Sequence, residues 1–248
     1  MDIEIKQDET IEDLQYKGLR LIQKNYGFRF GVDAVLISDF AEIRAGDEVL
    51  DIGTGSGVIP ILLSGKTKAK FITGVEIQHD IAEMASRSVL LNQLSEKVKI
   101  IEGDIKNREA IFPKSKFDVV VTNPPYIKQN GGIISDCDLQ AIARHEVKCT
   151  LADVLEAGSL LLKDNGRMAM VHRPERLVDI ITLMRENMIE PKVLRFVYPS
   201  KGKKAIIVLI RGTKHGNPQL NVLEPLYIHK ENGEYSEEIN RIYCREGR

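Results

Sequence analysis

Short apolar runs alternate with longer amphipathic stretches from residue 48 onward. The runs predict seven strands, at Glu48–Ile52, Phe71–Glu76, Val98–Glu102, Phe117–Thr122, Arg167–His172, Val193–Val197 and Ala205–Arg211. Between them, apolar residues recur at intervals of three and four, which predicts helices at Ile59–Ser64, Asp80–Asn92, Ala152–Leu162 and Pro174–Asn187. Because strands alternate with helices, we expect an α/β fold with a parallel sheet.

The last two predicted strands are too close in sequence for a parallel connection. Only the stretch Tyr198–Lys204 separates them, whereas a crossover between parallel strands needs about a dozen residues or more. We expect this pair to be antiparallel, joined by a loop at Pro199–Gly202. The sequence thus predicts a seven-stranded, mostly parallel sheet with one antiparallel strand near the C-terminal end.

Composition and charge limit the classes of function. The chain has 248 residues, 43% of them hydrophobic, and its net charge is −1. It can bury one large core, but it has no general electrostatic attraction to nucleic acid, so RNA binding would need a local basic patch. No apolar run approaches the roughly 18 residues of a membrane-spanning helix. The acidic start, Met1–Ile5, is unlike a secretory signal, so we expect a cytoplasmic protein.

The cysteines give no sign of a disulfide framework or a metal site. Cys137, Cys149 and Cys244 are an odd number, are widely spaced and form no Cys-x-x-Cys pair. Such spacing argues against structural disulfides and against a zinc knuckle. We expect reduced thiols and no bound metal.

Three glycines, Gly53, Gly55 and Gly57, follow the strand that begins at Glu48 and precede a helix. Glycine lets the backbone turn sharply there and lets a ligand approach closely, although a glycine turn can also serve only to connect strand and helix. Dinucleotide-binding turns need a further glycine where this chain has Val58. The Gly-x-Gly-x-Gly pattern, with Asp51 before it, resembles the first motif of S-adenosylmethionine (SAM) dependent methyltransferases. The resemblance implies backbone contacts to the methionine part of SAM, with Asp51 near its ammonium group.

Two carboxylates after the next strands are further candidates for cofactor binding. Glu76 ends the second strand, where a carboxylate can accept hydrogen bonds from both ribose hydroxyls. Asp104 follows the third strand and can accept one from the adenine amine, with Ile77 and Ile105 on the two faces of the ring. The alternatives are a surface acid for Glu76 and a cap of the following turn for Asp104.

The sequence Asn123-Pro124-Pro125-Tyr126 follows the strand that ends at Thr122. Prolines restrict the backbone and lack a donor, so they fix this loop at the strand end, where ligands bind in open α/β sheets. If the Asn123 side-chain oxygen and the Pro124 carbonyl each accept a hydrogen of a planar amine, the nitrogen lone pair can turn toward a methyl donor. Tyr126 would stack on the flat acceptor. The alternative is a proline-stiffened turn with a buried Tyr126.

This tetrapeptide resembles the acceptor motif of methyltransferases that act on adenine N6, and also that of enzymes that methylate the glutamine amide of release factors. Enzymes that act on guanine N2 in ribosomal RNA typically have Phe at the place of Tyr126. Residues 25–36 and the run Ala143-Arg144-His145-Glu146 resemble the bacterial tRNA adenine-N6 methyltransferases that modify valine tRNA beside its anticodon. The resemblance covers about residues 13–211.

The resemblance implies a Rossmann-like class I methyltransferase fold, SAM as cofactor and adenosine 37 of valine tRNA as acceptor. It implies three parts: an N-terminal cap segment (residues 1–44), a methyltransferase domain (45–215) and a C-terminal extension (216–248). Phe30 would lie over the cofactor, and Arg144 would contact a phosphate, order the loop after Tyr126 or form a solvated pair with Glu146. A protein glutamine methyltransferase, a ribosomal RNA methyltransferase and a non-catalytic scaffold are the alternatives.

The stretch Lys192–Lys214 contains cations and no Asp or Glu. Its seven basic residues are Lys192, Arg195, Lys201, Lys203, Lys204, Arg211 and Lys214. On a chain of net charge −1, such segregation can hold RNA phosphates, and we expect Lys201, Lys203 and Lys204 to contact tRNA. Lysines on an edge hairpin can instead serve to block edge pairing.

Overall fold

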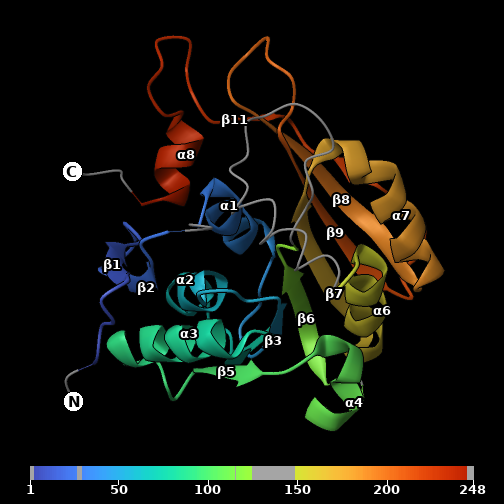
Figure 1. Cartoon of the computed structure of the whole chain (residues 1–248). Helices are drawn as coiled ribbons and strands as arrows, with labels where there is room; N and C mark the ends of the chain where they lie inside the picture. The colour runs from blue at the N-terminus through green and yellow to red at the C-terminus, as the bar shows by residue number, and fades with distance from the viewer. Residues whose placement is uncertain (1–2, 27–29, 115, 125–148, 245–248) are drawn as a thin grey trace.

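A central sheet with helices on both faces forms the body of the molecule (Figure 1). The computed structural model describes residues 3–26, 30–114, 116–124 and 149–244. Within them the sheet has nine strands, in the order β10-β8-β9-β7-β6-β3-β4-β5, and β11 also pairs with β8. The strands are β3 (Glu48–Ile52), β4 (Phe71–Glu76), β5 (Val98–Glu102), β6 (Phe117–Thr122), β7 (Leu162–His172), β8 (Ile189–Tyr198), β9 (Ile207–Lys214), β10 (Asn221–Val222) and β11 (Leu226–Tyr227).

The predicted α/β architecture is confirmed. Strands β3 to β7 pair in parallel, and β9 lies antiparallel between β7 and β8. The described sheet has two more strands than the predicted seven, because the two-residue strands β10 and β11 add in parallel to the edge of β8. The stretch Leu226–His229 predicts a strand in the C-terminal extension, and β11 lies there. β10 is not predicted, since two residues are too few to give a recognisable periodic pattern.

Helices cover the two faces of the sheet in separate groups (Figure 1). One face carries α1 (Val32–Phe40), α2 (Val58–Lys66) and α3 (His79–Leu91), and the other carries α4 (Arg108–Ile111), α6 (Leu151–Leu161) and α7 (Leu177–Glu186). Short 3₁₀ turns, Ile105–Asn107 and Pro174–Arg176, precede α4 and α7, and α8 (Glu237–Ile242) packs beside α1. None of the helices in the described part of the chain is long and apolar enough to cross a membrane.

An N-terminal hairpin, β1 (Glu9–Asp13) and β2 (Arg20–Lys24), is anchored on α3. The Arg87 guanidinium donates to both oxygens of Glu9, each at 2.7 Å, and burial of this pair leaves the Glu9 side chain only 1% exposed. The Ser88 hydroxyl accepts from the Ile22 backbone at 3.0 Å. Hairpin and helix therefore form one packed unit.

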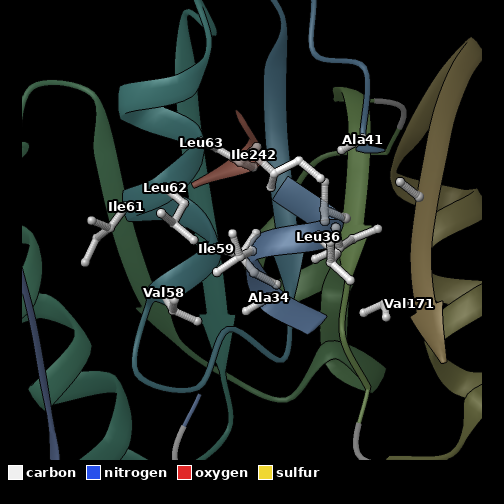
Figure 2. Packing of buried hydrophobic residues seen from close by; sticks show 14 of the residues in the cluster. Ala34, Leu36, Ala41, Val58, Ile59, Ile61, Leu62, Leu63, Val171 and Ile242 are labelled. Carbon is white, nitrogen blue, oxygen red and sulfur yellow. The ribbon is translucent and has the colours of Figure 1, made fainter. Parts of the chain in front are cut away.

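The first of two hydrophobic clusters lies between the sheet and the α1–α2 layer. Figure 2 shows side chains of α1 and α2 gathered there with Val171 of β7 and Ile242 of α8. Five consecutive residues of α1, from Ala34 to Ser38, are buried, because α8 covers its outer side. Five residues span more than one helical turn, so α1 lacks the broad polar face of a surface helix. The division of the chain into three parts stays a prediction.

We expect Leu36→Ala to lower the free energy of unfolding by about 2–5 kcal/mol, because Leu36 is 1% exposed and its loss leaves a cavity in the first cluster. Denaturant unfolding followed by circular dichroism measures the change. Val178→Ala is the matched control, since Val178 is 76% exposed on α7, and its effect should stay within about 0.5 kcal/mol. Equal effects of the two substitutions would contradict the packing described.

Candidate functional site

The carboxyl ends of four parallel strands meet at one edge of the sheet. β3 pairs in parallel with β4 and β6, and Ile52 lies opposite both Val75 and Thr122. The Thr122 hydroxyl donates to the Ile52 carbonyl at 2.9 Å, which fixes this register. Asn123 therefore follows its strand directly beside Gly53, and the ends of β4 and β5 lie on the other side of the glycine turn.

The three glycines of the turn all have positive φ angles, of 72° at Gly53, 54° at Gly55 and 84° at Gly57. A Cβ atom at Gly53 or Gly55 would meet no other atom within 4 Å, so open space lies over this part of the turn. A Cβ at Gly57 would lie 3.3 Å from the Cβ of Ala85. Two of the glycines therefore leave room for a ligand, and the third lets α2 approach α3.

Glu76 ties the glycine turn to the end of β4. Its side chain is buried, with Oε2 accepting from the Gly55 backbone at 3.0 Å and Oε1 accepting from the Gln78 backbone at 3.0 Å. The Gly53 and Thr54 amides both donate to the Val75 carbonyl at 3.0 Å. Glu76 is therefore not a surface acid, and its carboxylate is held at the edge of the open space.

Asp51 lies beneath this turn and is wholly buried. Neither of its oxygens accepts a hydrogen bond of good geometry from a described group, and the Thr54 hydroxyl is likewise unpaired. Burial raises the pKa of the Asp51 carboxyl to about 7, the Glu76 charge adds to the rise and the neighbouring Thr54 hydroxyl opposes it. A Cβ at Gly74 would lie 2.7 Å from the Thr54 hydroxyl, so glycine there makes room for Thr54.

Asp104 caps the 3₁₀ turn after β5, accepting from the Lys106 backbone at 2.9 Å. The capping alternative is thus present, and it occupies one oxygen of the carboxylate. Ile105 is buried and Ile77 is half-buried.

Cys149, which no motif marks in the sequence, lies near Asp104 and Glu76. Burial raises the pKa of its thiol to about 11, and the charges of Asp153, Asp104 and Glu76 contribute. The thiol therefore stays protonated at neutral pH.

Asn123 presents a buried acceptor at the end of β6. Its Oδ1 atom is inaccessible to solvent and receives no hydrogen bond from a described group. Pro124, which follows it, is buried and has no backbone donor. An unpaired buried acceptor costs about 1–3 kcal/mol, and such costs are concentrated at functional sites. Tyr126 and Arg144 lie outside the described residues, and Phe30 is half-buried against the first cluster.

Only part of the basic stretch is available to a ligand. Lys201, Lys203 and Lys204 are exposed on the turn between β8 and β9, and no described side chain pairs with them. The other four bind within the protein: Arg195 to Glu238, Arg211 to the Phe40 carbonyl, Lys192 to the Asn217 carbonyl and Lys214 to the Leu162 carbonyl. Because β8 runs in the same direction as β6, this lysine turn lies at the same sheet edge as Asn123.

Among the described residues, no three His, Cys, Asp or Glu side chains gather in a way that could hold a metal ion. Cys149 and Cys244 are free thiols. The titratable side chains described near Asn123 and the glycine turn are the carboxyl groups of Asp51, Glu76 and Asp104 and the protonated thiol of Cys149. Carboxylates accept hydrogen bonds from hydroxyl, amine and ammonium groups.

Comparisons with known proteins agree with this arrangement. Residues 31–191 match the family model described as methyltransferase small domain. The chain is 29% identical to the tRNA1(Val) (adenine(37)-N6)-methyltransferase of Porphyromonas gingivalis, over 92% of this chain and 91% of the relative. It is 26% identical to the enzyme of that name from Tolumonas auensis, over 90% of this chain and 92% of the relative.

Solved structures support the fold. A predicted O-methyltransferase from Agrobacterium tumefaciens has a TM-score of 0.70 at 20% identity, covering 86% of this chain and 95% of the other. A tRNA methyltransferase from M. jannaschii has a TM-score of 0.59 at 16% identity, covering 85% of this chain and 55% of the other. Both comparisons place the chain in the Rossmann-like class that the resemblance implied.

We expect the stability gain from Asp51→Asn to grow as pH rises from 5 to 7 and to level off above 7. The native carboxyl has a pKa of about 7, against about 3.9 when unfolded. Between these values the native state holds more protons than the unfolded state, so wild-type stability falls as pH rises, by at most about 1.4 kcal/mol per pH unit. The Asn variant lacks this loss. Denaturant unfolding of both proteins at several pH values measures the difference, and a pH-independent difference would contradict the buried, unpaired state of Asp51.

Proposed function

Because the chain belongs to the methyltransferase small domain family, we propose that it methylates the exocyclic N6 of an adenine in a tRNA anticodon loop in the cytoplasm. The methyl donor is SAM. The acceptor is adenosine 37 of valine tRNA, the substrate that the names of the relatives from P. gingivalis and T. auensis give for those enzymes.

One observation carries the proposal: the buried, unpaired Oδ1 of Asn123 at the carboxyl end of β6, directly followed by Pro124. A buried acceptor without a donor is complementary to a ligand that brings N–H groups. An exocyclic amine has two such hydrogens. Beside Asn123 the glycine turn leaves open space in which a methyl donor can be bound.

The residues at this edge suit binding of SAM. Gly53 and Gly55 allow the backbone to contact a ligand without an intervening side chain. The Glu76 carboxylate is held by the Gly55 and Gln78 amides. In the proposed complex it accepts from the ribose hydroxyls, and the second oxygen of Asp104 accepts from the adenine amine. Asp51 lies beneath the turn and acts on the ammonium group through its charge.

In the reaction, Asn123 accepts one hydrogen of the adenine amine and the Pro124 carbonyl accepts the other. The two bonds draw the amine hydrogens out of the ring plane, so that the nitrogen lone pair is localised. Bound SAM supplies an electrophilic methyl group. Transfer of that methyl group to N6 would break its bond to sulfur, and the extra proton on nitrogen would leave to water, so the protein need only orient the amine. Asn123 contributes by fixing orientation and by stabilising the charge that develops on the amine.

The lysine turn, residues Lys201, Lys203 and Lys204, supports RNA as the substrate class. In the strand order, β6 and β8 are three steps apart, which is about 14 Å at ~4.8 Å per step. A phosphate near the acceptor adenosine can therefore reach these ammonium groups. An adenine in a loop can be turned out of its stack without opening a long duplex.

We expect Gly55→Ala to weaken binding of S-adenosylhomocysteine at least tenfold, because the new methyl group would enter the open space that receives the cofactor. Isothermal titration calorimetry measures the affinity. Gly46→Ala is the matched control: Gly46 also has a positive φ, of 88°, with nothing within 4 Å of a Cβ, but lies in the loop before β3, at the opposite edge. Both variants place a side chain at a positive φ angle, so both bear backbone strain. Equal affinities would place the cofactor elsewhere.

We expect the wild-type protein, given labelled SAM and total tRNA, to produce N6-methyladenosine. Asn123→Ala should lower kcat by about 10²–10³, the usual effect of removing one group that stabilises developing charge, and should leave affinity for S-adenosylhomocysteine within twofold. Nucleoside analysis by mass spectrometry and calorimetry measure the two quantities. Label in a release factor with unlabelled tRNA would overturn the choice of acceptor, and an equal loss of turnover and cofactor affinity would overturn the role of Asn123.

A further inference from the structure

A cleft of about 550 Å³ lies between the lysine turn and the C-terminal segment. It is lined by Ser200, Lys201, His229, Lys230, Glu231 and Gly233. The volume is within the ~300–1,000 Å³ range of small-molecule sites. In Figure 1, the two loops that form it rise at the same end of the molecule, above β11. We call this the C-terminal cleft.

Backbone hydrogen bonds hold the two walls of the C-terminal cleft together. The His229 amide donates to the Pro199 carbonyl at 2.8 Å, and the Ile228 amide donates to the Tyr198 carbonyl at 2.9 Å. The opposite side is a short hairpin, closed by pairing of His229 with Tyr235 and by the Lys230 amide donating to the Glu234 carbonyl at 2.7 Å. The cleft is therefore built into the fold and is not a gap between loose loops.

One aromatic ring, the His229 imidazole, lines the C-terminal cleft, and the Tyr235 ring lies against it. The His229 imidazole stacks on the Tyr235 ring, with centroids 4.9 Å apart and planes at 24°. Tyr235 is 44% exposed. A stacked aromatic pair at the surface offers a flat face to a nucleobase, and such stacking is tolerant of base identity.

The cleft is lined by both positive and negative side chains, Lys201, Lys230 and Glu231, and this combination favours a ribonucleotide over a simple anion. Lys201 and Lys230 offer ammonium groups for a phosphate, and Lys230 is only loosely paired, 3.4 Å from the exposed Glu237. Glu231 would repel a free anion but can accept from a ribose 2′-hydroxyl or a base amine. Phosphate, hydroxyl donor and flat ring together are the chemistry of RNA.

We propose that the C-terminal cleft binds one nucleotide of the RNA substrate that lies a few nucleotides from the methylated adenosine, an inference that rests on the proposed function. The cleft opens beside the lysine turn, at the sheet edge that carries Asn123. A single-stranded loop whose adenosine is held at Asn123 can place a nucleotide two or more positions away there. The C-terminal segment thus takes part in binding the substrate.

The test uses the full-length protein and a fluorescently labelled anticodon stem-loop of valine tRNA, with affinity measured by anisotropy at several salt concentrations. We expect Lys230→Ala and His229→Ala each to raise Kd by about 3- to 30-fold, in line with the loss of a phosphate contact or a stacking contact. Lys230→Ala should also reduce the slope of log affinity against log salt by about 0.7. Affinity for S-adenosylhomocysteine should not change.

Lys68→Ala is the matched control, since it removes an exposed lysine that precedes β4, at the opposite edge of the sheet, and it should leave RNA affinity unchanged. Lys230→Gln, which keeps the length of the side chain and removes its charge, repeats the test should Lys230→Ala fold poorly. If these variants bind RNA as the wild type does, and the wild type methylates it, the cleft proposal alone is overturned. If the wild type neither binds nor methylates the stem-loop, both the proposed function and the cleft proposal are overturned.

Discussion

The parallel register of β3, β4 and β6 is the constraint on which the rest of the structure depends. Because Ile52 lies opposite both Val75 and Thr122, the glycine turn, the Glu76 carboxylate and the Asn123 amide are brought to one edge of the sheet. A shift of one residue in a strand would turn every side chain to the other face. The two hydrophobic clusters, one on each face, oppose such a shift and so hold the polar groups in place.

Polar groups at this edge are buried at a cost in stability. Asp51 is wholly enclosed with neither oxygen hydrogen-bonded to a described group, and Asn123 presents an unpaired acceptor. The cost is sustained by the apolar layers around them, in which α1 and α2 are buried along most of their length. Glu76 differs, because backbone amides satisfy both of its oxygens. The site therefore combines a carboxylate whose hydrogen bonds are already formed with acceptors that can form theirs only when a ligand binds.

The sequence predicts the sheet well and the surface less well. The bounds of β3 to β6 agree with the apolar runs, because strands buried on both faces have a continuous apolar pattern. The glycine turn before α2 and the segment at Asn123 and Pro124 can also be recognised in the sequence, because glycine and proline determine the backbone conformation directly. The two-residue edge strand β10 has no such pattern. Of the basic stretch, Arg195 and Lys214 turn inward to partners far away in sequence, Glu238 and Leu162, which spacing cannot reveal.

The sequence also does not predict that Gln78 and Cys149 lie beside the proposed cofactor site. Gln78 acts mainly through its backbone amide, which any residue other than proline could supply. Cys149 is placed near Asp104 by the start of α6, and a lone cysteine has no motif. Both lie where cofactor binding is proposed, so their roles follow from the fold of the chain around the sheet edge.

The most direct test of the account is a crystal structure of the protein with S-adenosylhomocysteine and an anticodon stem-loop of valine tRNA. We expect the Oδ1 atom of Asn123 to lie at hydrogen-bond distance, about 2.7–3.2 Å, from N6 of an adenine turned out of the loop. An adenine bound away from Asn123, or an Asn123 amide that bonds only to the protein, would contradict this expectation.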